Sequence, residues 1–342
     1  MKVFNILILI WFFVGCNNQN KENLSDLDLR LNSELYTKIE QSNMKFQGIK
    51  HFDLYNNDVA FVTYNPNKAF IKSKKKDSLI ELETDVRLGL KNPSLINVYN
   101  NRIFVWDSEK LKFFLFDLSG VFIKTLKSID KGVKDFVIYN KKVYFMFSGG
   151  HNKLLGVYDL QNEKIENEYV RPTNEHYVIE TNTKSGFIRL INQNIYFPDH
   201  GRKGFYKYSL SNEKFEFVSL DLKQYEIKKV NNYFNLISNK EKLINYLSNN
   251  SMYYDVINIE GCLGLIATND ETSKKNNYAR KKTIYKIDTI DNKKISAIKL
   301  SKQNHRLYSI GNIKDSDFYF VKKKIDSTKM SFKHSIHKLL LK

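Results

Sequence analysis

Two short polar segments of this sequence carry residues that could bind a ligand. Residues 148–152 contain His151, and residues 199–204 contain Asp199, His200, Arg202 and Lys203. Arginine offers a rigid fork for a carboxylate or phosphate, lysine a point charge, and aspartate an acceptor for sugar hydroxyls. These residue types indicate a site for an acidic or hydroxyl-rich ligand. The alternative is that the histidines are simply exposed loop residues.

Familiar catalytic motifs are missing from the sequence. It has no Gly-x-Ser-x-Gly nucleophile elbow, phosphate-binding loop, His-Glu-x-x-His motif or calcium loop. His334 and His337 are three residues apart, but on a strand this spacing directs two side chains to opposite faces, so we do not expect them to share a metal. We therefore assign no catalytic residues and predict no cofactor, and the sequence favours binding over catalysis.

The N-terminal residues predict export and lipidation. Met1 and Lys2 form a short cationic start, and an uncharged apolar run follows from Val3 to Val14. This run is too short to span a bilayer as a helix, so we expect a signal peptide over residues 1–15 rather than an anchor. It ends in Phe13-Val14-Gly15-Cys16, which resembles the lipobox of bacterial lipoproteins. The resemblance implies cleavage after Gly15 and acylation of Cys16, for example with palmitate, and the alternative is a buried cysteine.

The segment after Cys16 and the overall charge limit the kinds of partner that we expect. Residues 16–24 are polar and are expected to form a flexible tether to the membrane. Cys262 is the only other cysteine, so no intramolecular disulfide is available once Cys16 is lipidated. The formal net charge is +18. For an exported protein we expect no nucleic-acid partner but rather an acidic glycan, a glycolipid or an outer-membrane protein; the alternative is a solvated basic surface.

Repeated apolar runs predict an all-β fold. Residues 94–126 contain four such runs, broken by Asn-Asn, a charged tripeptide and Ser-Gly, which are hairpin signals. The pattern returns in residues 133–170 and 186–220, and weaker copies lie in 47–82, in 253–300 and after 305. Six copies of four antiparallel strands predict a six-bladed β-propeller over residues 25–342. Aromatic runs such as 113–116 are then expected to pack between blades.

The last copy offers only three strands, so the ring needs a further strand to close. Leu27, Leu29 and Leu31 alternate with period two and predict an N-terminal strand that completes the final blade. Leu27, Leu31, Leu35 and Ile39 also repeat every four residues, which favours a helix. A strand followed by a short helix over residues 34–42 would satisfy both patterns.

Three segments also resemble a known family. LIELET (79–84), RIFVWD (102–107) and FLFDLSGVFIKTL (114–126) are similar to lipid-anchored six-bladed propellers, related to NHL- and TolB-like repeats, of Gram-negative bacteria. The resemblance covers about residues 79–170 and implies a place in the cell envelope, at the outer membrane. Some six-bladed propellers are calcium-dependent hydrolases, so a calcium-assisted hydrolase or lyase is the alternative function.

Propeller topology divides the loops between two rims. Loops between the second and third strands of a blade share one rim with the links between blades; we call this the connection rim. The remaining turns lie on the opposite rim, the turn rim. The longer loops, 148–152, 199–204 and 269–280, fall on the connection rim, as does the link 223–250, which has helical spacing. Loops on a rigid scaffold often carry sites, so we expect a monomeric ligand-binding or protein-interaction module that uses this rim. The alternatives are tolerated insertions and an accessory subunit of an outer-membrane complex.

Overall fold

The computed structural model describes 18 segments of the chain. These are residues 32–39, 46–73, 78–82, 89–127, 129, 132–147, 153–170, 187–199, 202–222, 225, 233–248, 250–259, 262–268, 282–287, 295–299, 311–314, 317–326 and 331–340. Of the predicted binding residues, Asp199, Arg202 and Lys203 are among them, whereas Cys16, His151 and His200 lie outside.

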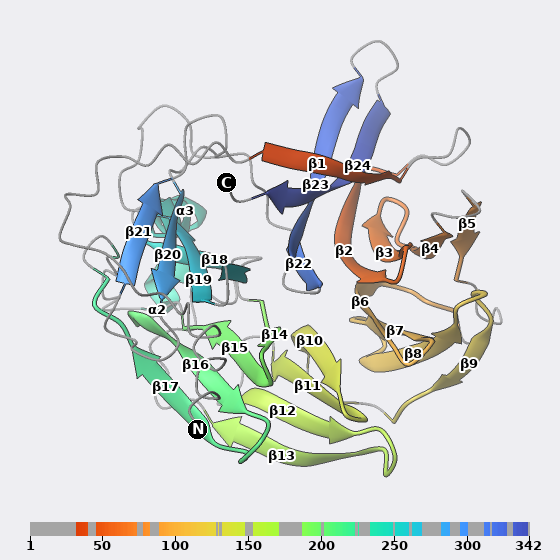
Figure 1. The fold of residues 1–342 in the computed structure, drawn as a ribbon, viewed down its shortest axis with the longest axis horizontal. Coiled ribbons are helices and arrows are strands. Elements are labelled where there is room, and N and C mark those ends of the chain that lie inside the picture. Colours follow the sequence, from red (N-terminus) through yellow and green to blue (C-terminus); the bar gives the residue numbers. More distant parts are fainter. Residues whose placement is uncertain are drawn as a thin grey trace, which may run out of the picture.

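Six four-stranded antiparallel sheets are arranged around a common centre as the blades of a propeller (Figure 1). Blade 1 contains β2 (Gly48–Tyr55), β3 (Asp58–Tyr64), β4 (Ala69–Ser73) and β5 (Ser78–Glu81). Blade 2 contains β6 (Pro93–Tyr99), β7 (Arg102–Asp107), β8 (Lys112–Asp117) and β9 (Phe122–Thr125). Blade 3 contains β10 (Val133–Tyr139), β11 (Lys142–Phe147), β12 (Lys153–Asp159) and β13 (Lys164–Val170).

The second half of the ring repeats this arrangement. Blade 4 contains β14 (Arg189–Ile191), β15 (Asn194–Pro198), β16 (Gly204–Ser209) and β17 (Phe215–Ser219). Blade 5 contains β18 (Met252–Ile259), β19 (Cys262–Thr268), β20 (Lys282–Ile287) and β21 (Ile295–Lys299). Blade 6 contains β22 (Gly311–Lys314), β23 (Asp317–Asp326), β24 (Ser331–Leu340) and the N-terminal strand β1 (Asn32–Lys38). The predicted all-β propeller of four-stranded blades is confirmed.

Tight turns connect the first two strands of blades 2 and 3. Asn100 and Asn101 both have positive φ, 48° and 58°, and Asn140 and Lys141 have 44° and 60°. Two consecutive positive φ values make a type I′ turn, which matches the twist of a hairpin and which asparagine tolerates well. The hairpin signals in the sequence therefore mark the turn rim correctly.

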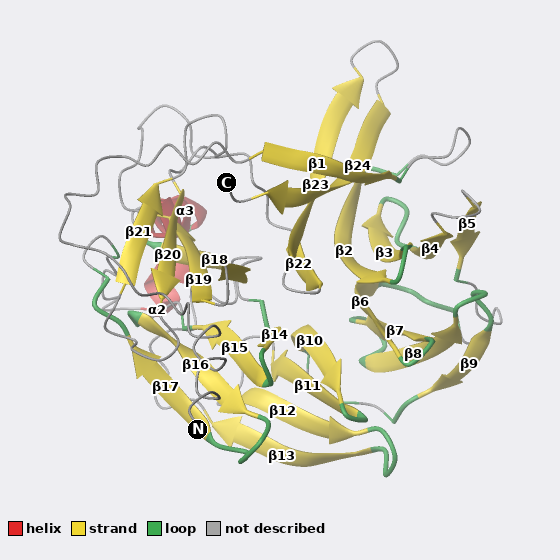
Figure 2. Ribbon diagram, in the orientation of Figure 1, coloured by secondary structure: helices red, strands yellow, loops and turns green. Residues whose placement is uncertain are grey.

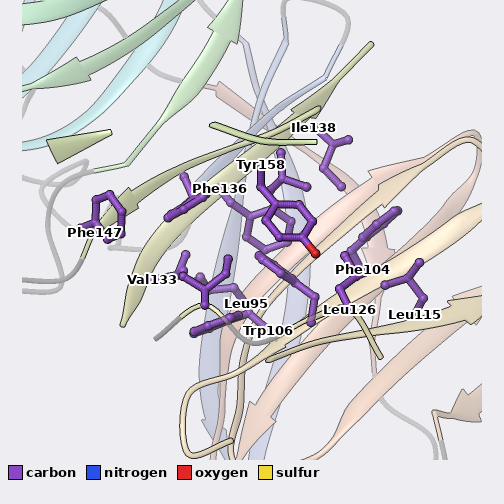
Figure 3. Packing of buried hydrophobic residues seen from close by; sticks show 14 residues of the cluster. Leu95, Phe104, Trp106, Leu115, Leu126, Val133, Phe136, Ile138, Phe147 and Tyr158 are labelled. Carbon is purple, nitrogen blue, oxygen red and sulfur yellow. The ribbon is translucent and has the colours of Figure 1, made fainter. Parts of the chain in front are cut away.

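Apolar side chains on both faces of the strands hold neighbouring blades together. Residues 113–116 are all buried, with Phe113 and Leu115 packed toward blade 3 and Phe114 and Phe116 toward blade 1. Figure 3 shows the cluster between blades 2 and 3, where the rings of Phe113 and Phe136 lie 4.9 Å apart at 71°. The predicted packing of the aromatic run between blades is confirmed.

An N-terminal strand closes the ring, as predicted, and the structure describes it over Asn32–Lys38. β1 pairs antiparallel with β24, from Asn32 opposite Leu340 to Lys38 opposite Ser335. The predicted strand at 27–31 lies outside the described residues, and the predicted helix over 34–42 is wrong for residues 34–38. This strand sits at the outer edge of blade 6, so its sequence needs little apolar character, and pairing with β24 decides its place. Ile39, directly after it, is fully buried.

In the described part of the link between blades 4 and 5 lie two short helices (Figure 2). They are α2 (Tyr233–Ile237) and α3 (Lys240–Ser248), and they fall inside the predicted helical insertion 223–250. No helix among the described residues is long and apolar enough to cross a membrane.

Candidate functional site: a charged cluster at the centre of the ring

The innermost strands of four blades contain a β-bulge near their start. The register of pairing shifts between Ile49 and His51, Pro93 and Leu95, Val133 and Asp135, and Tyr253 and Asp255. A bulge redirects the side chains that follow it. The residues directly after the four bulges are His51, Leu95, Asp135 and Asp255, so three of these four equivalent positions are polar.

Side chains from four blades meet at the centre of the ring. His51 Nε2 of blade 1 lies 3.3 Å from Asp135 Oδ1 of blade 3, a contact between blades that are not neighbours. Arg189 of blade 4 donates from Nη1 to Asp135 Oδ2 at 3.2 Å and from Nη2 to Asp255 Oδ2 of blade 5 at 3.0 Å. All four side chains are buried, with at most 5% of each residue exposed. We call them the axial cluster.

The axial cluster also completes the inner edges of the sheets. The innermost strand of a blade has unpaired N–H groups on its inner side, and buried N–H groups need acceptors. Asp135 Oδ2 accepts from Ile188 N at 3.1 Å, and its Oδ1 accepts from Phe136 N at 2.9 Å. Asp53 Oδ2 of blade 1 accepts from Val98 N of blade 2 at 2.6 Å in the same manner. The cluster therefore links the blades as well as pairing Arg189 with two carboxylates.

The two carboxylates of the axial cluster have opposite pKa shifts. Burial would raise the pKa of Asp135, but His51 and Arg189 outweigh burial and lower it below its ordinary value. Burial raises the pKa of Asp255 to about 6; Arg189 opposes this rise, whereas the negative charge of Asp135 adds to it. Asp255 is therefore the carboxyl group of the cluster that is expected to take up a proton in mildly acidic solution.

The raised pKa of Asp255 predicts that the free energy of unfolding depends on pH. The pKa of Asp255 is higher in the folded chain than the ordinary 3.8, so the folded state binds its proton more tightly than the unfolded state does. The resulting stability is fully present below about pH 4 and is lost as the pH rises through about 6. The difference corresponds to roughly 3 kcal/mol. Urea unfolding of the wild type and of Asp255→Asn, measured between pH 4 and 7, should show the wild type losing stability relative to the variant as the pH rises. Parallel curves would contradict this assignment.

Asp199, Arg202 and Lys203, the described residues among those predicted from the sequence to bind a ligand, lie elsewhere, on the connection rim. Asp199 directly follows β15, and Arg202 and Lys203 precede β16. Arg202 Nε donates to Asp199 Oδ2 at 2.8 Å, its guanidinium lies 3.6 Å from the ring centre of Phe217, and it also bonds the hydroxyl of Tyr206. The structure thus brings Asp199 and Arg202 together as an internal ion pair, and Lys203 is the exposed cation of this loop.

This loop is also fixed to the next blade. The hydroxyl of Tyr253 in β18 accepts from Gly204 N at 3.0 Å and donates to Arg202 O at 3.3 Å. Tyr253 stacks on Tyr225 with ring centres 4.3 Å apart, and burial raises the pKa of both hydroxyls. The main chain around Lys203 is therefore held rigidly at the junction of blades 4 and 5.

His51, Asp135, Arg189 and Asp255 were not identified from the sequence as site residues. A signal was present: IKHFDLY, VKDFVIY and YYDVINI each carry His or Asp four residues before the end of the innermost strand. Arg189 does not occupy that position, and only the three-dimensional arrangement connects it to two carboxylates. Among the described residues, no group of three or more metal-ligating side chains could hold a metal ion.

Solved structures match nearly the whole chain. A streptogramin B lyase structure is 14% identical, with a TM-score of 0.55, over 91% of this chain and 98% of that one. A member of the DUF4221 family from Bacteroides vulgatus is 8% identical, with a TM-score of 0.61, over 92% of this chain and 100% of that one. A putative exported protein from Bacteroides fragilis is 12% identical, with a TM-score of 0.61, over 93% and 96%.

What these proteins share with this chain is the β-propeller fold. At such low identity the likeness extends to the fold alone. No protein-family model matches the sequence. No curated protein matches it either.

Proposed function

We propose that the protein is an exported propeller, anchored to the membrane through a lipidated Cys16, that binds a ligand at its connection rim. The observation that supports binding over metal-assisted catalysis is that the central carboxylates already accept hydrogen bonds from the protein. Both oxygens of Asp135 accept hydrogen bonds, and Asp255 accepts from Val256 N at 2.8 Å and from Arg189 at 3.0 Å.

A calcium ion does not fit the described part of this centre. Calcium takes six to eight oxygen ligands, roughly, from carboxylates and carbonyls. Here Arg189 already pairs with both facing carboxylates, and a cation would have to displace its guanidinium from a position with 4% exposure. The axial cluster is better suited to holding blades together, which leaves the connection rim for recognition.

The exposed positive charge of this loop suggests the class of ligand. Lys203 is exposed, and the ion pair of Asp199 with Arg202 fixes the loop that presents it. We include His151 and His200, which the sequence places in the corresponding loops of consecutive blades. An exposed lysine on a hydrogen-bonded loop of an envelope protein suits an acidic glycan or the sugar headgroup of a glycolipid.

Charge-removing substitutions on the two rims test this site. The full chain in detergent micelles would be titrated with polygalacturonate, and with dextran as an uncharged polysaccharide. Lys203→Gln should weaken binding of polygalacturonate severalfold. Lys141→Gln, which removes an exposed charge from a tight turn on the opposite rim, should bind like the wild type. Equal losses in the two variants would indicate a diffuse effect of net charge and would rule out a site on the connection rim.

Acylation of Cys16 has a separate test. Cys16→Ala should accumulate as an unprocessed precursor and should not incorporate labelled palmitate, because the other cysteine of the chain, Cys262, is buried. Incorporation of label into this variant would contradict a lipid anchor at Cys16. Cys262→Ala serves as the control and should be labelled normally, since Cys262 is buried within β19.

A further inference from the structure

The start of β1 locates the point at which the tether joins the propeller. Asn32 pairs with Leu340 at the end of β24, the third strand of blade 6. In the other blades the connection from the third to the fourth strand lies at this place, for example between Asp117 and Phe122 in blade 2. Because that connection belongs to the turn rim, the chain enters blade 6 from the turn rim.

The length of chain between Cys16 and β1 bears on which rim can lie against a membrane. Residues 16–31 separate the acylated position from β1. A random coil of this length would have a root-mean-square extension of about 22 Å. The seven residues of β1 span about 23 Å. To present the connection rim to the bilayer, this segment would have to pass along the whole blade, which takes up its entire average extension. An anchor beside the turn rim leaves that extension available for reaching the lipid.

The described turns of the turn rim are short and mostly polar. Their exposed residues include Asn57, Asn101 and Ser211, with Val121 as an exposed apolar residue. Lys141 adds an exposed positive charge, which is favourable beside anionic headgroups. The described helices α2 and α3, by contrast, belong to the link on the connection rim.

We infer that the turn rim lies against the membrane and that the connection rim points away from it. The surface it contacts is the headgroup layer of a bilayer that contains anionic phospholipid. This inference rests on the proposed acylation of Cys16. It adds that the rim proposed for ligand binding is the one presented to molecules approaching from the aqueous side.

Fluorescence quenching by labelled lipids tests the orientation. Lipidated full chains would be reconstituted in phosphatidylethanolamine–phosphatidylglycerol vesicles that contain a headgroup nitroxide lipid, with a fluorophore on a single introduced cysteine. Two matched pairs lie on opposite sides of the ring: Asn57→Cys and Asn67→Cys in blade 1, and Ser211→Cys and Lys203→Cys in blade 4. Within each pair the first residue is on the turn rim and the second on the connection rim. The parent chain, whose Cys262 is buried, provides the labelling blank.

Quenching should be severalfold stronger for Asn57→Cys than for Asn67→Cys, and for Ser211→Cys than for Lys203→Cys. Equal or reversed quenching in a chain shown by palmitate labelling to be acylated would overturn the orientation and leave the anchor intact. A chain that carries no acyl group at Cys16 would overturn the anchor and the orientation together. If the ring were tilted, the quenching difference between turn rim and connection rim would have opposite signs in blades 1 and 4. Such opposite results in the two pairs would also overturn the inference.

Discussion

Arg189→Met should destabilise the propeller by about 3–5 kcal/mol, because it leaves two buried carboxylates without their shared cation. Arg189 contacts Asp135 at 3.2 Å and Asp255 at 3.0 Å, and its residue exposure is 4%. Methionine keeps much of the side-chain volume, so the loss would be mainly electrostatic. Urea unfolding at pH 7 measures the effect.

Two further variants isolate the electrostatic part of this effect. Arg102→Met removes an exposed arginine at the start of β7 and should change stability by no more than about 0.5 kcal/mol. In an Asp255→Asn background, Arg189→Met should lower the free energy of unfolding by less than in the wild type, because only one buried carboxylate then loses its cation. If the double variant is additive, the two groups are not coupled and the axial cluster does not act as one network.

Phe145→Ala should cost about 3–5 kcal/mol, the range for deleting a buried aromatic side chain. Phe145 is fully buried in the cluster between blades 2 and 3, where its ring lies 4.9 Å from that of Phe147. Thermal or urea unfolding measures the loss. Val170→Ala, at an exposed apolar residue of an outer strand, should be close to neutral. Near-wild-type stability of Phe145→Ala would argue against packing between blades.

The same ring explains a glycine in the next strand. Gly156 pairs with Phe145 across the sheet, and a Cβ added at Gly156 would lie 2.3 Å from the tip of the Phe145 ring. Gly156→Ala should therefore be destabilising in the wild type and much less so in Phe145→Ala, which vacates the space. Equal effects of Gly156→Ala in both backgrounds would mean that the ring does not press on this glycine.

Local patterns predicted most of the fold, because each blade is built from contacts close in sequence. The runs around 94–126 fall on β6 to β9, and Asn100-Asn101 and Asn140-Lys141 form the tight turns. Strands buried on both faces need continuous apolar runs, and hairpin turns need residues that tolerate positive φ, so both leave a direct trace in the sequence. The repeat then implied a ring.

The closing strand shows where local patterns fail. Residues 27–39 fit a strand and a helix about equally, and the edge position of β1 demands little of its side chains. The choice of Asn32–Lys38 was made by hydrogen bonds to β24, which lies some three hundred residues away in the sequence.

The sequence by itself determined the six-blade repeat, the polar loop at 199–204 and the lipobox-like segment ending at Cys16. Only the tertiary structure decided that Arg202 pairs with Asp199 and that Arg189 joins Asp135 to Asp255. The reason is that these contacts join oppositely charged groups that no sequence pattern pairs, and for Arg189 they lie in a buried space. Closing the ring brings His51, Asp135, Arg189 and Asp255 from four blades into one low-dielectric centre, where each buried charge needs a partner that no local spacing specifies.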